Sequence, residues 1–114
     1  MVVFGSGKPQ RQMLFSLDLA KVLVWSLEHY SDADVPLIVT GEEHSVQALA
    51  KLAAETVGFT GQIANDESKA DGPLRRAASA EKLKAIMPRM KWTTLASAMT
   101  ATYKMCQPEE EGGR

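Results

Sequence analysis

The chain has 114 residues, of which 45% are hydrophobic and 24% are charged, which is typical of a globular domain and not of a disordered segment. Thirteen basic and fourteen acidic residues give a net charge of −1, so the charge balance favours neither nucleic acid nor an anionic membrane as a partner. No apolar run approaches the roughly 20 residues that span a bilayer, and residues 1–7 lack the basic and apolar regions of a secretory signal.

The single cysteine, Cys106, cannot form a disulfide within the chain. This is compatible with a reducing compartment, and we expect a cytoplasmic protein. Cys106 itself is expected to be a small buried side chain on a terminal helix.

The first residues predict two short strands joined by a tight turn. Residues 2–4 are β-prone, and residues 5–9 contain two glycines and a proline, which indicate a turn. Residues 11–15 are predicted to form a second strand that pairs with the first as a hairpin.

A helix is predicted to begin at Ser16, whose hydroxyl can cap the first turn, with Asp18 adding favourable charge near the N-terminus. Apolar residues at helical spacing predict a buried stripe along it, made of Leu17, Ala20, Leu23, Val24, Leu27 and Tyr30. The continuous apolar run Leu37, Ile38 and Val39 then predicts a covered strand.

Three further helices are expected. The first is capped by Ser45 and ends at Gly58, and its inner face consists of Val46, Leu49, Ala53 and Val57. Residues 59–64 are then predicted to form a turn and a short edge strand, and residues 65–73 a loop. The next helix is capped by Ser79 and ends at Pro88, and the last runs from about Thr94 to Cys106. Residues 107–114 are predicted to form a disordered tail.

Alternating strands and helices predict an α/β fold, a small mixed lobe over residues 1–106. Because the second residue already lies in a strand, we expect this lobe to belong to a larger fold that is truncated at its N-terminal side.

The usual catalytic patterns are absent from this sequence. The run Gly5-Ser6-Gly7-Lys8 lacks the spacing of a phosphate-binding loop, and Pro9 follows it where a helix would have to begin. His29 and His44 have no ligand-spaced partner, so we expect solvated side chains and no metal site. By contrast, Arg11 follows a tight turn in an apolar stretch, and its fork of donors suits a diphosphate.

The run Val3-Phe4-Gly5-Ser6-Gly7-Lys8-Pro9-Gln10-Arg11-Gln12-Met13-Leu14 resembles the Trp-Gly-x-Gly-x-Pro-x-Arg-[Glu/Gln]-Phe segment of GDP-L-fucose synthases. These are extended short-chain dehydrogenase/reductase enzymes that epimerise and then reduce GDP-4-keto-6-deoxy-mannose. Residues 66–76, Asp-Glu-Ser-Lys-Ala-Asp-Gly-Pro-Leu-Arg-Arg, are similar to the Asp-x-[Ser/Thr]-Lys-x-Asp-Gly loop of that family. The resemblance extends from Val2 to about Cys106.

This resemblance implies that the chain is the C-terminal, substrate-binding lobe of such an enzyme. It makes Arg11 a substrate contact at the diphosphate, Asp71 a contact to the hydroxyls or base of the nucleotide, and Arg76 a basic group near the phosphates. Phe4 stands where the family has a Trp that contacts substrate, so it keeps an aromatic face and loses the indole donor.

The motifs that the family uses for NADP and for catalysis do not occur in this sequence. They are an amino-terminal Gly-x-x-Gly-x-x-Gly turn, a Tyr-x-x-x-Lys pair, and a cysteine and histidine used in epimerisation. The resemblance therefore implies no catalytic residue here, no NADP binding by this chain alone, and a missing N-terminal Rossmann domain as its partner. The full-length enzyme is expected to use NADP, to bind a GDP-sugar and to form a homodimer.

Two alternatives stay open on the residues. One is the same lobe from another nucleotide-sugar epimerase, dehydratase or reductase, which the identity of the bound nucleoside diphosphate would decide. The other is a stand-alone binding module without catalysis.

Overall fold

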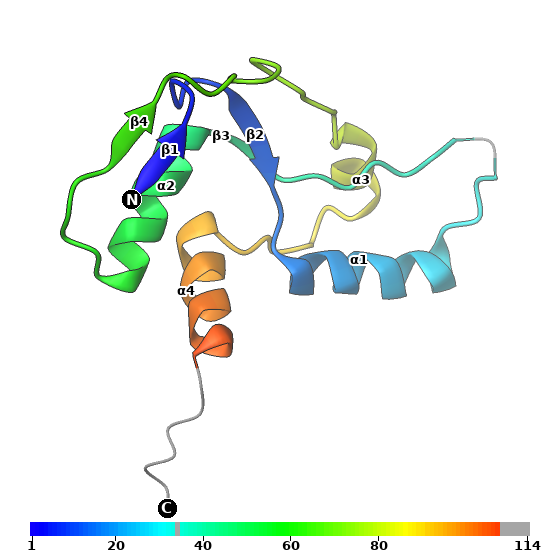
Figure 1. Cartoon of the computed structure of the whole chain (residues 1–114). Helices are drawn as coiled ribbons and strands as arrows, with labels where there is room; N and C mark the ends of the chain where they lie inside the picture. The colour runs from blue at the N-terminus through cyan, green and yellow to red at the C-terminus, as the bar shows by residue number, and fades with distance from the viewer. Residues whose placement is uncertain (34, 108–114) are drawn as a thin grey trace, which may run out of the picture.

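The computed structural model describes residues 1–33 and 35–107, which form a mixed α/β arrangement as predicted. In chain order its elements are β1 (Val2–Phe4), β2 (Gln10–Met13), α1 (Ser16–His29), β3 (Glu42–Ser45), α2 (Val46–Val57), β4 (Ala64–Asp66), α3 (Glu81–Ile86) and α4 (Leu95–Cys106) (Figure 1). The tail predicted over residues 107–114 lies, from residue 108 on, outside the described residues.

The predicted hairpin between the first two strands is wrong. β1 pairs in parallel with β4, and β2 pairs antiparallel with β3, so the two strands belong to different sheets. The reason lies in the connecting turn, which is held from both sides. The Gly5 amide donates to the Asp66 carbonyl at 2.9 Å, and the Gln47 amide at the start of α2 donates to the Gly7 carbonyl at 2.9 Å. These bonds direct β2 away from β1 and toward β3.

Helix α1 has the predicted start, but Ser16 does not cap it. The N-cap residue is Phe15, without a side-chain hydrogen bond. Asp18 faces inward instead of compensating the helix dipole at the surface, and only 1% of it is exposed. Its two carboxylate oxygens accept hydrogen bonds from the Thr93 amide at 2.7 Å and the Thr93 hydroxyl at 2.9 Å. This contact ties α1 to the segment that leads into α4.

The apolar stripe predicted to be buried along α1 is exposed. The buried residues of the helix are Asp18 and Val22, on the side that faces the rest of the chain. The large apolar side chains of the stripe are Leu17, Leu23, Val24 and Leu27, which are 52%, 54%, 61% and 88% exposed. In Figure 1 the neighbouring elements lie on one side of the helix, so its opposite face has no described element to pack against.

Residues 37–39 do not form the predicted strand. They have no regular secondary structure, pair with no other described strand, and lead into β3, which begins only at residue 42. Of the last two predicted helices, one begins where expected and the other does not. The Thr94 hydroxyl caps α4 by accepting from the Ser97 amide at 3.2 Å. Helix α3 begins later than predicted, because Ala80 and not Ser79 is its N-cap.

Helix α2 agrees with the prediction at both ends. The Ser45 hydroxyl accepts from the Ala48 amide at 3.0 Å, and Gly58 ends the helix with a φ of 75°, a conformation that favours glycine. Of its predicted inner face, Val57 is 45% exposed. The other three residues line an open apolar groove of about 550 Å³ between β1, α2 and α4, whose wall includes Val3, Val46, Leu49, Ala53, Leu95 and Met99.

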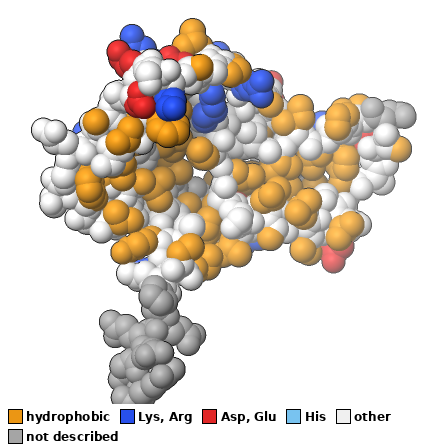
Figure 2. Space-filling model, viewed as in Figure 1, with side chains coloured by type: hydrophobic (Ala, Val, Ile, Leu, Met, Phe, Trp, Pro, Cys, Tyr) orange, Lys and Arg blue, Asp and Glu red, His pale blue; other side chains and the backbone are white. Residues whose placement is uncertain are grey.

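The chain has a small core and a flattened shape. Its buried apolar side chains are Val3, Val22, Ala54, Leu83 and Ala98. The molecule measures 48 × 47 × 19 Å with a radius of gyration of 17.5 Å, whereas a compact domain of this length has about 13 Å. Cys106, predicted to be buried, is exposed. Hydrophobic side chains spread over the visible face below the charged groups (Figure 2). Among the described helices, none has the length and apolar character needed to cross a membrane.

Candidate functional site

Asp71 and the turn over residues 5–9 form one structural unit. The Ser6 amide donates to Asp71 Oδ1 at 2.6 Å, and the Ser6 hydroxyl donates to Asp71 Oδ2 at 2.7 Å. These two bonds, the backbone one first, hold the pKa of the Asp71 carboxyl below its usual range. Gly5, at φ 83°, lies so close that a Cβ atom there would be 2.1 Å from Asp71 Oδ1. The carboxylate thus requires glycine at this position.

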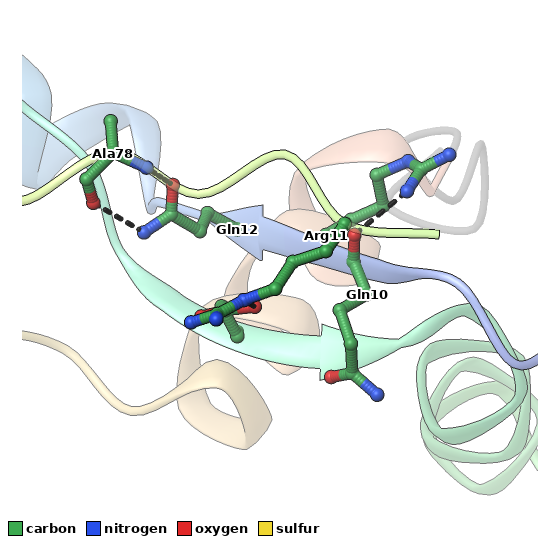
Figure 3. Close-up of polar contacts among 6 residues, drawn as sticks. Gln10, Arg11, Gln12 and Ala78 are labelled. Atoms are coloured by element: carbon green, nitrogen blue, oxygen red, sulfur yellow. Dashed lines mark hydrogen bonds and ion pairs between the residues drawn. The ribbon is translucent and has the colours of Figure 1, made fainter. Parts of the chain in front are cut away.

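Arg11 joins the same unit from β2. Its Nη1 donates to the Pro73 carbonyl at 2.8 Å and to the Gln10 carbonyl at 2.7 Å, the second of which is drawn in Figure 3. The side chain is half-buried and lies next to Gly72, where a Cβ would be 3.6 Å from Arg11 Nη2. Because Nη1 is occupied, the donors left to a ligand are those of Nε and Nη2.

The loop after Asp71 runs along the free side of β2. The Gln10 amide donates to the Leu74 carbonyl at 2.8 Å, and Gln10 and Arg75 form a parallel bridge. Further along, the Gln12 side-chain amide exchanges two hydrogen bonds with the backbone of Ala78, both of 2.9 Å (Figure 3). The segment from 74 to 78 is therefore fixed to β2 at both ends.

The two consecutive arginines of this loop have different surroundings. Arg75 forms a bidentate ion pair with Glu43 of β3, with its Nε 2.8 Å from Glu43 Oε2. This contact holds the pKa of the Glu43 carboxyl below its usual range. Arg76 is exposed and has no hydrogen bond or ion pair with any residue in the described part of the chain. The bridge between Gln10 and Arg75 is parallel, so the two segments run in the same direction from it. Arg11 is the next residue on β2, and Arg76 is the next residue on the loop.

Phe4 lies at the end of β1, immediately before the turn. Its ring is 66% exposed, and Lys69 Nζ lies over it, 5.6 Å from the ring centroid. A cation at this distance is attracted to the ring face. Phe4 therefore presents an aromatic surface with a lysine above it.

Of the four predicted site residues, the structure connects Phe4, Arg11 and Asp71 through the turn and the segment from 71 to 73. Arg76 lies three residues further along, on the stretch fixed to β2, and no contact joins it to the other three. Lysine and arginine side chains gather at this end of the molecule, with acidic side chains among them (Figure 2). An anionic ligand with an aromatic part would meet cations and a ring face here.

Sequence reasoning missed the residues that hold the unit together, which are Ser6, Gln12 and Glu43. Ser6 carried a signal, because a hydroxyl residue between two glycines is suited to a close turn with a carboxylate. Gln12 and Glu43 carried none, since their partners at residues 78 and 75 are far away in the sequence.

A separate cavity of about 450 Å³ opens where the end of β2 and the beginning of β3 meet the beginnings of α1, α3 and α4. Its wall combines the buried Asp18 with Thr93, Lys84 and Trp92, and it contains none of the four predicted site residues. Both oxygens of Asp18 are already bonded to Thr93, which assigns the carboxylate a structural role.

The described residues contain no group of three or more side chains that could hold a metal ion. The glycine turn also does not suit the pyrophosphate of a dinucleotide. Such a turn must open a helix, so that the helix N-terminus faces the phosphates, whereas residues 5–9 lead into β2. A Cβ at Gly7 would meet Gln47 Oε1 at 2.4 Å, so the turn is closed by α2.

Comparison with known proteins links this arrangement to one group of enzymes. No family model matches the chain. It is 38% identical to the GDP-L-fucose synthase of Dictyostelium discoideum over 101 aligned residues. These make up 87% of this chain and 32% of that protein. It is 35% identical over 105 residues to a probable GDP-L-fucose synthase of Drosophila melanogaster, covering 90% and 32%. The chain spans about one third of the length of the curated relatives that it matches.

Comparison of the fold with solved structures leads to the same group of enzymes as comparison of the sequence. A crystal structure of a GDP-L-fucose synthetase from Naegleria fowleri bound to NADP superposes with a TM-score of 0.86 and 34% identity, over 90% of this chain and 33% of that one. Sequence and fold together identify the chain as a homologue of GDP-L-fucose synthase that corresponds to about one third of the enzyme.

Proposed function

We propose that the chain is the nucleotide-sugar-binding part of an NADPH-dependent enzyme that epimerises and reduces GDP-4-keto-6-deoxy-mannose to GDP-L-fucose. The observation that supports this proposal is the unit formed by the turn over residues 5–9 and the segment from 71 to 78. This unit joins the exposed ring of Phe4, the guanidinium of Arg11 with some donors free for a ligand, and Asp71. Further along the same segment lies Arg76, which is not paired with any of the described residues.

Each residue has a role that its surroundings allow. Arg76 and the remaining donors of Arg11 bind the diphosphate, because guanidinium groups match phosphate oxygens in geometry and charge. The exposed face of Phe4 stacks on a planar or apolar part of the ligand. Asp71 fixes the turn through Ser6, and the second lone pair on each oxygen accepts from a hydroxyl of the nucleotide.

The chemistry belongs to the remaining two thirds of such an enzyme. In this proposal that part binds NADP, supplies the catalytic residues and forms the homodimer, while the present chain alone is inactive. We propose the cytoplasm as the compartment, because the one cysteine of the sequence leaves no internal disulfide to maintain.

Calorimetric titration of the chain with GDP, UDP and dTDP tests the proposal. GDP is expected to bind most tightly. The Arg76→Ala variant is expected to weaken GDP binding by about tenfold, as the loss of a charge-assisted contact does. Arg89→Ala is the matched control, since Arg89 is an exposed arginine outside the unit. Preferential binding of UDP or dTDP would instead indicate another nucleotide-sugar enzyme. An equal effect of the two variants would contradict the assigned site.

A further inference from the structure

Arg75 and Arg76 are consecutive residues, but the described chain engages them differently. Arg75 donates from Nε to Glu43 Oε2 at 2.8 Å and from Nη2 to Glu43 Oε1, and the Glu43 side chain is 25% exposed. Arg76 has no such partner among the described residues. A single bond between exposed charges fixes little, whereas two bonds from one guanidinium fix its orientation as well as its position. Glu43 therefore determines where the side chain of Arg75 lies.

The register of β2 and β3 assigns the side chains of these strands to two faces. Glu43 is opposite Gln12, and His44 is opposite Arg11. Residues that are directly opposite share a face, and successive residues of a strand point to opposite faces. Glu43 and Gln12 therefore lie on one face of the strand pair together with Gln10, and Arg11 lies on the other.

The loop beside β2 continues this pattern. Gln10 and Arg75 form the parallel bridge, so Arg75 shares the face of Gln10, which is also the face of Glu43. The ion pair agrees with this assignment. Two residues beyond Arg76, the backbone of Ala78 exchanges its two hydrogen bonds with the Gln12 side chain, so the loop stays beside β2 past Arg76 (Figure 3).

The alternation of side chains makes the positions of the two arginines dependent on each other. With Arg75 on the face of Glu43, the next residue, Arg76, belongs to the face of Arg11. A shift of the loop by one residue would exchange the faces of Arg75 and Arg76 together. The ion pair of Glu43 opposes that shift, and so selects which of the two arginines accompanies Arg11.

We propose that Glu43 is a positioning residue of the diphosphate site. By holding Arg75 on the far face of β2 and β3, it directs Arg76 to the face of Arg11, where the two guanidinium groups bind one diphosphate. Glu43 and Arg75 do not contact the ligand themselves. This inference rests on the proposed function, because it concerns the ligand contact that is assigned there to Arg76.

The sign of one substitution separates positioning from a simple effect of charge. A carboxylate near the site repels phosphates, so by charge alone Glu43→Gln would tighten GDP binding. As a positioning residue, Glu43 holds Arg75, and its loss leaves Arg76 free to turn away from Arg11. We therefore expect Glu43→Gln to weaken GDP binding in a calorimetric titration by about fivefold, less than the effect of Arg76→Ala.

Glu42→Gln is the matched control for this substitution. Glu42 is the adjacent residue of β3, its side chain is 90% exposed, and it has no contact with the loop. The variant removes the same charge at nearly the same place, and it should not weaken GDP binding. Glu43→Asp keeps the charge and shortens the side chain, so its effect should be intermediate. Circular dichroism shows whether each variant keeps the secondary structure of the parent chain.

Exchange of the two partners tests the ion pair itself. The double variant Glu43→Arg with Arg75→Glu can form the pair in reverse, and it should recover most of the GDP affinity that Glu43→Gln loses. Residue 75 is then no longer an arginine, so this recovery would exclude Arg75 as the phosphate ligand. Adding Glu43→Gln to Arg76→Ala should cause no further loss, because Glu43 acts through Arg76.

A measurement without ligand follows the loop directly. The Gln10 amide donates to the Leu74 carbonyl at 2.8 Å, so its hydrogen exchange reports whether the loop lies along β2. We expect this amide to exchange faster in Glu43→Gln than in the parent chain, and to be protected again in the exchanged double variant.

The outcomes separate this inference from the proposed function. Weaker GDP binding by Glu43→Gln, with recovery in the exchanged variant and no loss in Glu42→Gln, supports the positioning role. Unchanged or tighter binding by Glu43→Gln, while Arg76→Ala still weakens it, overturns this inference alone. Weak binding by the exchanged variant despite a protected Gln10 amide also overturns it and identifies Arg75 as a ligand contact. GDP affinity that Arg76→Ala leaves unchanged overturns both proposals.

Discussion

Asp71 fixes the turn that carries the candidate site, because both of its carboxylate oxygens accept hydrogen bonds from Ser6, 65 residues earlier in the chain. Phe4 directly precedes this turn, and Arg11 follows it on β2. The two strands that it joins belong to separate sheets, so this contact, together with those of Gly5 and Gly7, fixes the aromatic ring relative to the guanidinium.

The contact makes stability depend on pH. The pKa of Asp71 is lowered in the folded chain, first by the Ser6 amide and then by the Ser6 hydroxyl. A carboxyl whose folded pKa is depressed stabilises the fold above its unfolded pKa of about 3.9. This stabilisation is lost as the pH falls through the folded pKa. Asp71→Asn is therefore expected to flatten the fall in urea midpoint between about pH 5 and pH 2.

Some pH dependence should remain in Asp71→Asn, since Glu43, with its own pKa lowered by Arg75, contributes in the same range. Ser6→Ala, which removes the hydroxyl and keeps the amide, should have an intermediate effect. An unchanged slope in Asp71→Asn would show that the two hydrogen bonds do not persist in solution.

A second prediction concerns the buried contact between Asp18 and Thr93. Asp18→Ala leaves the Thr93 amide and hydroxyl without their acceptors, and the loss of two buried hydrogen bonds should reduce the free energy of unfolding by about 2–3 kcal/mol. Thr93→Ser keeps both donors and is expected to cost less than about 1 kcal/mol. Urea denaturation measures both. A comparable loss in the two variants would indicate that packing of the Thr93 methyl group, and not the hydrogen bonds, stabilises this junction.

A third prediction concerns Arg11 in a chimera whose matching third of the Dictyostelium enzyme is replaced by this chain. Arg11→Ala should weaken binding of a GDP-sugar by about 2 kcal/mol. Arg11→Lys should recover only part of this, because an ammonium group cannot donate to Pro73 and to a phosphate in the geometry of a guanidinium. Arg76→Ala should cost less than Arg11→Ala. Unchanged KM and kcat in Arg11→Ala would show that the site lies elsewhere.

The exposed face of α1 leads to a fourth prediction, for the isolated chain. Burying one large apolar side chain contributes about 1.5–3 kcal/mol, and the free energy of unfolding of a domain is about 5–15 kcal/mol. Four such side chains on α1 are at least half exposed. The chain should therefore bind a dye specific for exposed apolar surface and unfold over a broad temperature range. Leu23→Gln together with Leu27→Gln should reduce dye binding. A monomer that binds no dye and melts in one sharp transition would be a complete domain.

Local sequence signals predicted those parts of the fold that local interactions determine. Ser45 and Gly58 delimit α2, and Thr94 begins α4, because a cap is satisfied by amides and carbonyls of the same helix turn. The alternation of predicted strands and helices also predicted a mixed α/β chain. The residues of the candidate site were found through their resemblance to a family, and their role in binding is still a prediction.

Strand pairing and burial were decided by the tertiary structure. The turn over residues 5–9 was recognised, but the hairpin inferred from it was wrong, because contacts with Asp66, Asp71 and Gln47 direct the two strands into different sheets. The periodicity of α1 correctly showed an apolar face, yet that face is exposed. Periodicity determines which side chains share a face of a helix, whereas burial of that face requires a surface to pack against, and the described chain offers one only to Asp18 and Val22.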